Sequence, residues 1–384
     1  MLYKNANIYA GQGFFHGAFR IKEDTITETG QDLTPQNGEE EQDLEGMYVV
    51  PGFWDIHTHG AVGVDVNHAD AKDLEKMCVF FATQGTTSWL CSVLTDTEEA
   101  TNRAIDAYLE WKKLPHRGAI LQGIHLEGPF LAPAYKGAMP EQLLQTPDAA
   151  LIRRYQERAQ GGIRYITIAP ELEGALEMIP ELTTMGIRVA LGHSAADYAT
   201  TVQAVRNGAR AATHTGNAMR LWHQHEPAIF GAVLEQREVS CEVICDGLHL
   251  HPATVRLILQ HKGNERVVAI TDSIMAAGLA DGEYMLGVNE IVVKDGDAKL
   301  KTDGTRAGST LTMGKALQNF RTFTQMPLQR LVPLFTENPV RLLGEDASYG
   351  TIQPGKAADF VVLDADLQVR KTVVHGNLVY NSQK

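Results

Sequence analysis

Val49-Val50-Pro51-Gly52-Phe53-Trp54-Asp55-Ile56-His57-Thr58-His59-Gly60 is the stretch that decides the fold. Its apolar, partly β-branched run predicts a buried strand over residues 49–57. Because strand side chains alternate between two faces, His57 and His59 point the same way. Two imidazoles so placed form half of a metal site, although such a pair taken alone is more often incidental. The rest of the chain must supply the other half.

The composition bounds the possible functions. A chain of 384 residues with 44% hydrophobic content can bury a large core. Its net charge of −13, with acidic and basic residues mixed, argues against nucleic acid or an anionic membrane as a partner. No apolar run approaches the roughly 18 residues of a membrane span, and residues 1–5 lack the apolar core of a signal peptide. We therefore expect a cytoplasmic protein.

Cysteine usage agrees with a reducing compartment. Cys78, Cys91, Cys241 and Cys245 form no CxxC pair. We interpret them as small buried apolar residues rather than as disulfide partners or metal ligands.

Both ends of the chain have strand patterns, and the middle does not. Strand-like runs at 2–9, 17–22 and 25–29 precede an acidic loop, and the last residues show strands at 360–363 and 369–380. We infer a small β-sandwich assembled from residues 1–48 and 346–384. It would close over a central domain of residues 49–345.

The central domain alternates strands and helices. Strands are predicted at 49–57, 86–93, 119–126, 165–169, 188–191, 211–214, 239–245 and 267–271. Helices are predicted between them at 71–83, 98–113, 148–160, 173–184, 196–207 and 252–261. A hairpin over 284–301 and two outer helices, 313–325 and 328–343, follow the eighth strand. Eight strand–helix units predict an α/β fold, a TIM-like (β/α)8 barrel, whose chemistry lies at the carboxyl ends of its strands.

Side chains that can bind metal gather at those carboxyl ends. They are His57 and His59 on strand one, Glu127 on strand three, His193 on strand five, His214 on strand six and Asp272 on strand eight. Each follows an apolar run and precedes a loop containing glycine or serine. Because the barrel brings these ends together, the joint pattern predicts a metal site far more strongly than any one histidine does.

The order HxH, Glu, His, His, Asp on successive strand ends, with β elements at both termini, resembles the amidohydrolase superfamily. Several segments narrow the resemblance to its deacetylases of N-acetylglucosamine 6-phosphate. They are His-Leu-Glu-Gly-Pro-Phe (125–130), Leu-Gly-His-Ser (191–194), Asn-Ala-Met (217–219), Asp-Gly-Leu-His (246–249), Thr-Asp-Ser (271–273) and Ala-Gly-Ser-Thr-Leu-Thr-Met (307–313). The resemblance covers nearly the whole chain. It implies hydrolysis of the acetamide of this amino-sugar phosphate to glucosamine 6-phosphate and acetate.

The resemblance also implies roles for the residues at the strand ends. Glu127, His193 and His214 would hold Zn²⁺ or Fe²⁺ with one position open for water, whose pKa falls to about 7 on binding. Asp272 would take the water proton and deliver it to the leaving amine, and His249 would orient or polarise the carbonyl. His57 and His59 either hold a second metal that shares Glu127 or support the first one. The protein would thus bind one or two metal ions per subunit, whereas Asp55 supports the strand.

Substrate contacts follow from the same resemblance. They are expected from Ala138, Met139, Asn217, Ala218, His225, Arg306, Ala307 and Gly308. This chain departs from the family at His225, where relatives usually carry a phosphate-binding arginine, a much stronger phosphate ligand than imidazole. Either His223, His225 and Arg220 share that task, or the need for phosphate is relaxed. In the family this loop can reach across a dimer, which favours a homodimer.

Three alternatives stay open at this point. Thr215 and Gly216 widen the pocket, so an enzyme for N-acetylgalactosamine 6-phosphate or a related sugar would look nearly the same. Another amidohydrolase, opening a cyclic amide or deaminating a ring, would share the metal ligands. A non-catalytic scaffold should have lost Asp272 or a ligand, and none is lost.

Overall fold

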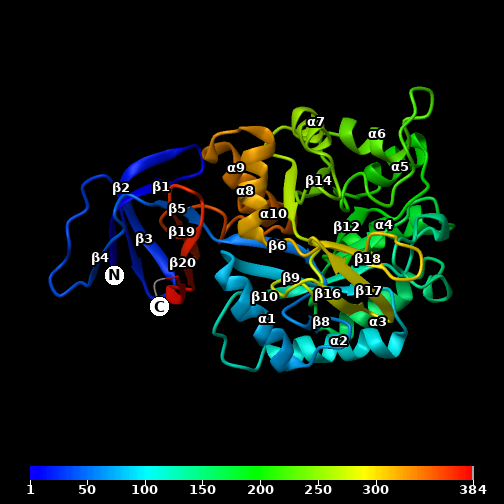
Figure 1. Ribbon diagram of the computed structural model, residues 1–384, viewed down its shortest axis with the longest axis horizontal. Helices are drawn as coiled ribbons and strands as arrows, with labels where there is room; N and C mark the ends of the chain where they lie inside the picture. Colours follow the sequence, from blue (N-terminus) through cyan, green and yellow to red (C-terminus); the bar gives the residue numbers. More distant parts are fainter. Residues whose placement is uncertain (383–384) are drawn as a thin grey trace.

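The computed structural model describes residues 1–382 and shows two parts joined side by side (Figure 1). Segments from both ends of the chain form a β-sandwich, and the chain between them forms a (β/α)8 barrel. The first and last described strands, β1 and β21, belong to the same sheet (Figure 1). No helix in residues 1–382 has the length and apolar character needed to cross a membrane.

The sandwich sheet has the strand order β21-β20-β19-β5-β1-β2-β3, with β4 paired to β1. Its strands are β1 (Leu2–Tyr9), β2 (Phe14–Lys22), β3 (Thr25–Gly30), β4 (Glu41–Asp43), β5 (Tyr48–Pro51), β19 (Phe360–Leu363), β20 (Val369–Val374) and β21 (Asn377–Asn381). Three aromatic rings, those of Tyr3, Phe19 and Phe360, pack mutually with centroids 5.0 Å apart. This apolar centre is separate from the barrel core.

Strands β5 and β19 connect the sandwich to the barrel because their two faces belong to different cores. Val49 and Phe360 point into the sandwich, whereas Val50 and Val361 point into the core that the barrel shares. The two-residue period of a strand thus fixes the position of one part against the other.

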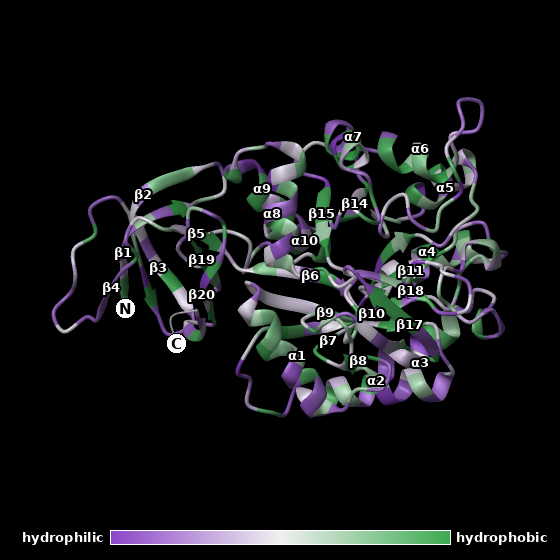
Figure 2. Ribbon diagram, viewed as in Figure 1, coloured by the Kyte–Doolittle hydropathy of each residue, from purple (hydrophilic) through white to green (hydrophobic). Residues whose placement is uncertain are grey.

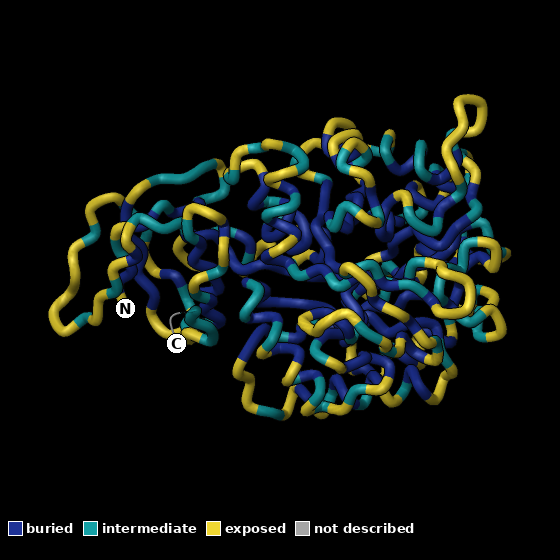
Figure 3. The backbone as a smooth tube through the Cα atoms, in the orientation of Figure 1, coloured by how far each residue is buried: buried dark blue, intermediate teal, exposed yellow. Residues whose placement is uncertain are grey.

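The barrel is a parallel sheet with the order β15-β14-β13-β12-β11-β10-β9-β6. Its strands are β6 (Phe53–Thr58), β9 (Thr86–Leu94), β10 (Ile120–Glu127), β11 (Ile163–Ile168), β12 (Arg188–Leu191), β13 (Ala211–Ala212), β14 (Ser240–Ile244) and β15 (Val267–Ile270). All eight predicted barrel strands are present. Figure 3 shows these strands buried at the centre and exposed chain confined to the periphery.

Helices cover the outside of the barrel. They are α1 (Ala71–Thr83), α2 (Glu98–Trp111), α3 (Ala149–Arg158), α4 (Ala175–Thr184), α5 (Tyr198–Arg206), α6 (Ala228–Glu235), α7 (Pro252–Lys262), α8 (Met313–Thr324), α9 (Leu328–Phe335) and α10 (Glu337–Leu343). Figure 2 shows many hydrophilic residues on α2 and α3, two helices at the periphery of the barrel. The starts of α1 and α5 are fixed by Asp70 and Asp197, whose carboxylates accept backbone N–H bonds.

Short elements lie over the mouth of the barrel. They are the pair β7 (Gly60–Ala61) and β8 (Val64–Asp65), the 3-10 turns η1 (Pro133–Tyr135) and η2 (Glu141–Leu143), and the three-stranded sheet β16 (Gly282–Leu286), β17 (Asn289–Lys294) and β18 (Asp297–Leu300). The predicted hairpin over 284–301 corresponds to this last sheet.

Several predicted elements were wrong in their boundaries. Residues 49–57 are not one strand, because β5 pairs with β1 and β19 in the sandwich and only β6 enters the barrel. Residues 369–380 form two strands that meet at a turn around Gly376. The predicted helix 328–343 is divided at Thr336, whose backbone leaves the helical region, and α6 was not predicted at all.

Candidate metal centre and active site

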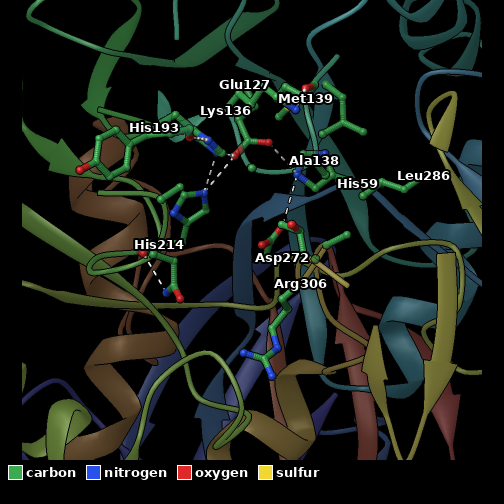
Figure 4. A pocket seen from close by; sticks show the side chains of 18 of the residues that line it. His59, Glu127, Lys136, Ala138, Met139, His193, His214, Asp272, Leu286 and Arg306 are labelled. Atoms are coloured by element: carbon green, nitrogen blue, oxygen red, sulfur yellow. Dashed lines mark hydrogen bonds and ion pairs between the residues drawn. The ribbon is translucent and has the colours of Figure 1, made fainter. Parts of the chain in front are cut away.

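The predicted metal-binding side chains meet at one mouth of the barrel. Figure 4 shows four of them, His59, Glu127, His193 and His214, together with Asp272. His57 lies within β6, Glu127 is the last residue of β10, and His193, His214 and Asp272 follow β12, β13 and β15. These five side chains and that of His59 are all buried. The convergence arises because parallel strands in a barrel end on the same side.

Glu127, His193 and His214 form the first of two metal-competent trios. Oε1 of Glu127 lies 3.0 Å from Nε2 of His193 and 3.1 Å from Nε2 of His214. The two imidazole nitrogens are 3.0 Å apart. These three atoms form a nearly equilateral triangle.

His57, His59 and Glu127 form the second trio. The two Nε2 atoms are 3.1 Å apart, and Oε2 of Glu127 lies 3.2 Å from Nε2 of His59. Asp272 Oδ1 is also 3.2 Å from that nitrogen. Nε2 of His57 lies 3.5 Å from Oε1 of Glu127, so this carboxylate is in contact with the imidazoles of both trios and could contribute a ligand to either.

Hydrogen bonds at the far side of three of the four rings set their tautomers, whereas Nδ1 of His214 has no partner among the described residues. Nδ1 of His59 donates to the Ser92 carbonyl oxygen at 3.0 Å, and Nδ1 of His193 donates to the Tyr135 carbonyl oxygen at 2.8 Å. Nδ1 of His57 lies 3.0 Å from Oε2 of Glu242. With the ring proton on Nδ1, each neutral imidazole turns the bare lone pair of its Nε2 toward the centre, which is the arrangement that metal ligands adopt.

The donor set fits a divalent cation. Tetrahedral Zn²⁺ with bonds of about 2.0–2.1 Å requires donor atoms about 3.3 Å apart. The donor-to-donor distances of 3.0–3.5 Å in the two trios are close to that value. Imidazole and carboxylate donors suit Zn²⁺ and Fe²⁺, so these residues could hold such an ion.

The charges in the cluster shift the pKa values of its members in opposite directions. Burial alone would lower the pKa of His59, but Asp272 and Glu127 raise it to about 9. Burial would raise the pKa of Glu127 and of Asp272, yet the neighbouring imidazoles hold both below their usual values. Both carboxyl groups are therefore ionised at neutral pH, as a metal ligand and a general base must be.

Three of the site residues have a strained backbone. His193, His214 and Asp272 have φ values of 47°, 27° and 50°, in the left-handed region that favours glycine. Such residues cost on the order of 1–3 kcal/mol each and occur mostly at functional sites. All three side chains contribute to the common centre.

His249 forms a separate pair with Asp246 beside the metal centre. Asp246 accepts the Nδ1–H of His249 at 2.7 Å and the backbone N–H groups of Leu248 and His249 at 2.8 Å each. Burial would raise the pKa of Asp246, but these donors hold it below its usual value. The aspartate therefore stays charged and fixes the ring, leaving Nε2 for the cavity.

A cavity of about 480 Å³ lies over the metal centre. Its wall includes Ala138, Met139, Asn217, Ala218, His249, Arg306, Ala307 and Gly308, which the sequence predicted as substrate contacts. Arg306 is already engaged, because its guanidinium binds both carboxylate oxygens of Asp297 and the Leu248 carbonyl oxygen. The sequence did not assign Lys136, Leu94 and Leu286, which also line the cavity.

His225 is not brought to this cavity within one chain. It lies with Arg220 and His223 on the loop of residues 219–227 before α6, which projects from the barrel in Figures 1 and 3. Residues 221–226 are all exposed. The predicted contact of His225 with substrate thus remains a prediction that requires a second chain.

Two motif residues serve the structure behind the site. His125, two residues before Glu127, has both ring nitrogens bonded to hydroxyl groups, those of Ser92 and Thr167. Burial and the neighbouring His57 lower its pKa well below the usual value, so it stays neutral. Asp55 accepts from the backbone N–H and the hydroxyl of Thr271, in agreement with a supporting role.

A family model of the amidohydrolases matches residues 48–379. The chain belongs to the amidohydrolase family. The sequence is 35% identical over 339 residues to N-acetylglucosamine-6-phosphate deacetylase from Bacillus subtilis (strain 168), covering 88% of this chain and 85% of that protein. It is also 35% identical over 339 residues to N-acetylgalactosamine-6-phosphate deacetylase from Escherichia coli O157:H7, covering 88% of this chain and 89% of that protein. The two identities are equal, so they do not distinguish the sugar epimers.

Solved structures of two similar enzymes match the fold of this chain over nearly its full length. A mutant of N-acetyl-D-glucosamine-6-phosphate deacetylase from Mycobacterium smegmatis, in complex with N-acetyl-D-glucosamine-6-phosphate, superimposes with a TM-score of 0.92 at 33% identity and 99% coverage of both chains. The enzyme of the same name from Thermotoga maritima gives 0.90 at 32% identity, with both chains fully covered. The predicted barrel with a β-sandwich built from both termini is therefore confirmed.

Proposed function

We propose that this protein hydrolyses the acetamide of N-acetylglucosamine 6-phosphate to glucosamine 6-phosphate and acetate, a step in the breakdown of amino sugars. The observation that carries the proposal is the convergence of Glu127, His193, His214 and Asp272 on the floor of one cavity. The similarity to deacetylases of this substrate over nearly the whole chain supports it. Four buried, unpaired cysteines support a cytoplasmic location.

Glu127, His193 and His214 would hold the cation that activates water, and His57 and His59 would hold a second one together with Glu127. Zn²⁺ or Fe²⁺ bound by these donors would lower the pKa of a coordinated water to about 7 and so supply a nucleophile in neutral solution. Imidazole and carboxylate donors suit either ion.

Asp272 is the proposed general base and acid. Its carboxylate lies at the metal centre, with Oδ1 3.2 Å from Nε2 of His59, and it lines the cavity. It would accept the proton of the attacking water and then deliver it to the amide nitrogen as the C–N bond breaks. The delivery is necessary because an unprotonated amine leaves poorly.

His249 and the cavity walls would position the substrate. When the His249 ring is protonated, its Nε2–H can donate to the carbonyl oxygen of the acetamide while Asp246 balances the charge. The apolar wall of Leu94, Met139 and Leu286, close to His59, suits the acetyl methyl group, with Ala307 and Gly308 nearby. Asn217, Ala218 and Lys136 would face the sugar and its phosphate.

The test of the function is an assay of acetate release from a panel of substrates by enzyme of known metal content. We expect N-acetylglucosamine 6-phosphate to have the highest kcat/KM. The unphosphorylated sugar and N-acetylgalactosamine 6-phosphate, the second candidate, should be poorer. Turnover of a cyclic amide, or ammonia release without acetate, would contradict the proposal.

Replacing Asp272 with asparagine should remove the proton relay while keeping the shape of the site. We expect kcat to fall by about 10²–10⁴, the usual contribution of general acid–base catalysis. Metal bound by Glu127, His193 and His214 should remain, as measured by elemental analysis. Retained turnover would contradict the role of Asp272, and Asp366→Asn, at an exposed position, serves as the control.

The loop of residues 219–227 is the proposed dimer contact. Leu221 and Trp222 are 83% and 56% exposed, which is unusual for large apolar side chains, and Arg220, His223 and His225 are beside them. In a homodimer this loop would reach the partner's cavity and offer cationic groups to the phosphate of the substrate.

Replacing both Leu221 and Trp222 with aspartate should therefore convert a dimer into a monomer in sedimentation velocity. It should also raise KM for the phosphorylated sugar more than for the unphosphorylated one. Leu257→Asp, at an exposed position on α7, is the matched control. A variant that stays dimeric with unchanged KM would show that the loop has neither role.

A further inference from the structure

Glu242 is a fully buried carboxylate directly behind the metal centre. It is the third residue of β14, a strand whose other residues are also buried. One oxygen, Oε2, lies 3.0 Å from Nδ1 of His57 and accepts the backbone N–H of His214, also at 3.0 Å. Glu242 therefore contacts one member of each trio without lining the cavity.

A charge at this position is costly for the fold. Burial of an ionised carboxylate is unfavourable unless partners compensate for its lost hydration. The buried hydroxyl of Tyr165 lies close to Glu242 and interacts with its carboxylate. The other compensation for this buried group comes from its bonds to His57 and to the backbone of His214, both at the metal centre.

The bond to His57 indicates a role for Glu242 in holding a metal ligand. In the second trio, His59 is held by a neutral acceptor, the Ser92 carbonyl oxygen, and in the first trio His193 is likewise held by that of Tyr135. His57 alone among these three donates to a carboxylate. A charged acceptor fixes the proton on Nδ1 and makes Nε2 a more basic ligand.

We propose that Glu242 is the positioning residue that makes the trio of His57, His59 and Glu127 a cation site. The inference rests on the proposed function, in which this trio holds a second ion. Glu242 acts through His57 and does not touch substrate. Without it, the His57 ring can turn or carry its proton on Nε2, the atom that must face the ion.

Two variants separate the hydrogen bond from the charge. Glu242→Gln has the same shape and keeps an oxygen that can accept from His57 and His214, but it removes the charge. Glu242→Leu removes both. Glu337→Gln is the matched control, because Glu337 also accepts a side-chain hydrogen bond, from Tyr9 at 2.7 Å, at a place distant from the barrel mouth.

The measurement is the number and affinity of zinc ions bound by the full-length protein. Metal-free protein is titrated with Zn²⁺ against a coloured chelator, and bound zinc is counted by elemental analysis after dialysis. Circular dichroism shows whether each variant is folded. We expect two equivalents in the wild type and in Glu337→Gln.

In Glu242→Leu we expect the affinity of the weaker-binding zinc equivalent to fall by about 10- to 100-fold, the usual effect of removing a hydrogen-bond partner of a metal ligand. In Glu242→Gln we expect a smaller fall in affinity. The other equivalent should be unchanged in Glu242→Gln, whose amide oxygen still accepts the backbone N–H of His214. Folded variants that bind two equivalents with wild-type affinity would overturn the inference, and so would loss of both equivalents from the glutamine variant. A wild type that binds one equivalent would instead contradict the second cation of the proposed function.

Discussion

The seam between the first and last strands of the barrel is the constraint on which the site depends. β6 and β15 lie at opposite ends of the sheet order, so the barrel forms only if they meet. The carboxylate of Asp55 on β6 accepts a hydrogen bond from the Thr271 hydroxyl at 2.5 Å, and the Asp272 backbone N–H donates to the His57 carbonyl oxygen at 2.9 Å. These bonds place Asp272 beside the histidine pair. Without this closure the proposed general base, Asp272, would lie apart from His57 and His59.

The site buries several charged side chains, whose mutual attraction offsets part of the cost of burying them. Carboxylates and imidazoles that would each be costly to bury are placed close together, and their interactions shift the pKa values toward ionised carboxylates and cationic imidazoles. A bound cation would replace the imidazole protons as the positive charge that balances these carboxylates. Strained backbone at His193, His214 and Asp272 adds to the cost. The large apolar core of the barrel offsets it, as is usual where function and stability compete.

Much of the fold could be predicted because strand periodicity and the position of polar residues at strand ends are local signals. They correctly indicated the barrel strands and the convergence of His57, Glu127 and His214. The division of residues 48–58 between two sheets could not be predicted, since residues 49–54 contain no polar side chain that would mark a break and only the pairing partners of β5 and β6 differ. The helix α6 was missed because its sequence is apolar with little amphipathic contrast.

Within the site, the sequence was informative about side chains that face the cavity and less so about those behind it. His125 and Glu127 share one strand face, but only coordinates show that His125 is held between two hydroxyl groups. Glu242 and Asp246 were not assigned either. A glutamate in an otherwise apolar strand was a signal for the first, and the Asp-Gly-Leu-His segment contained the second. The role of His225 depends on a second chain, which one sequence cannot place.

The central claim is that side chains from separate strands together bind one catalytic cation. Anomalous diffraction at the zinc edge, from crystals grown with Zn²⁺, tests it most directly. The account predicts a peak about 2.0–2.2 Å from the Glu127 carboxylate and from Nε2 of both His193 and His214. Zinc bound only elsewhere, with these three side chains free of metal at saturation, would contradict it.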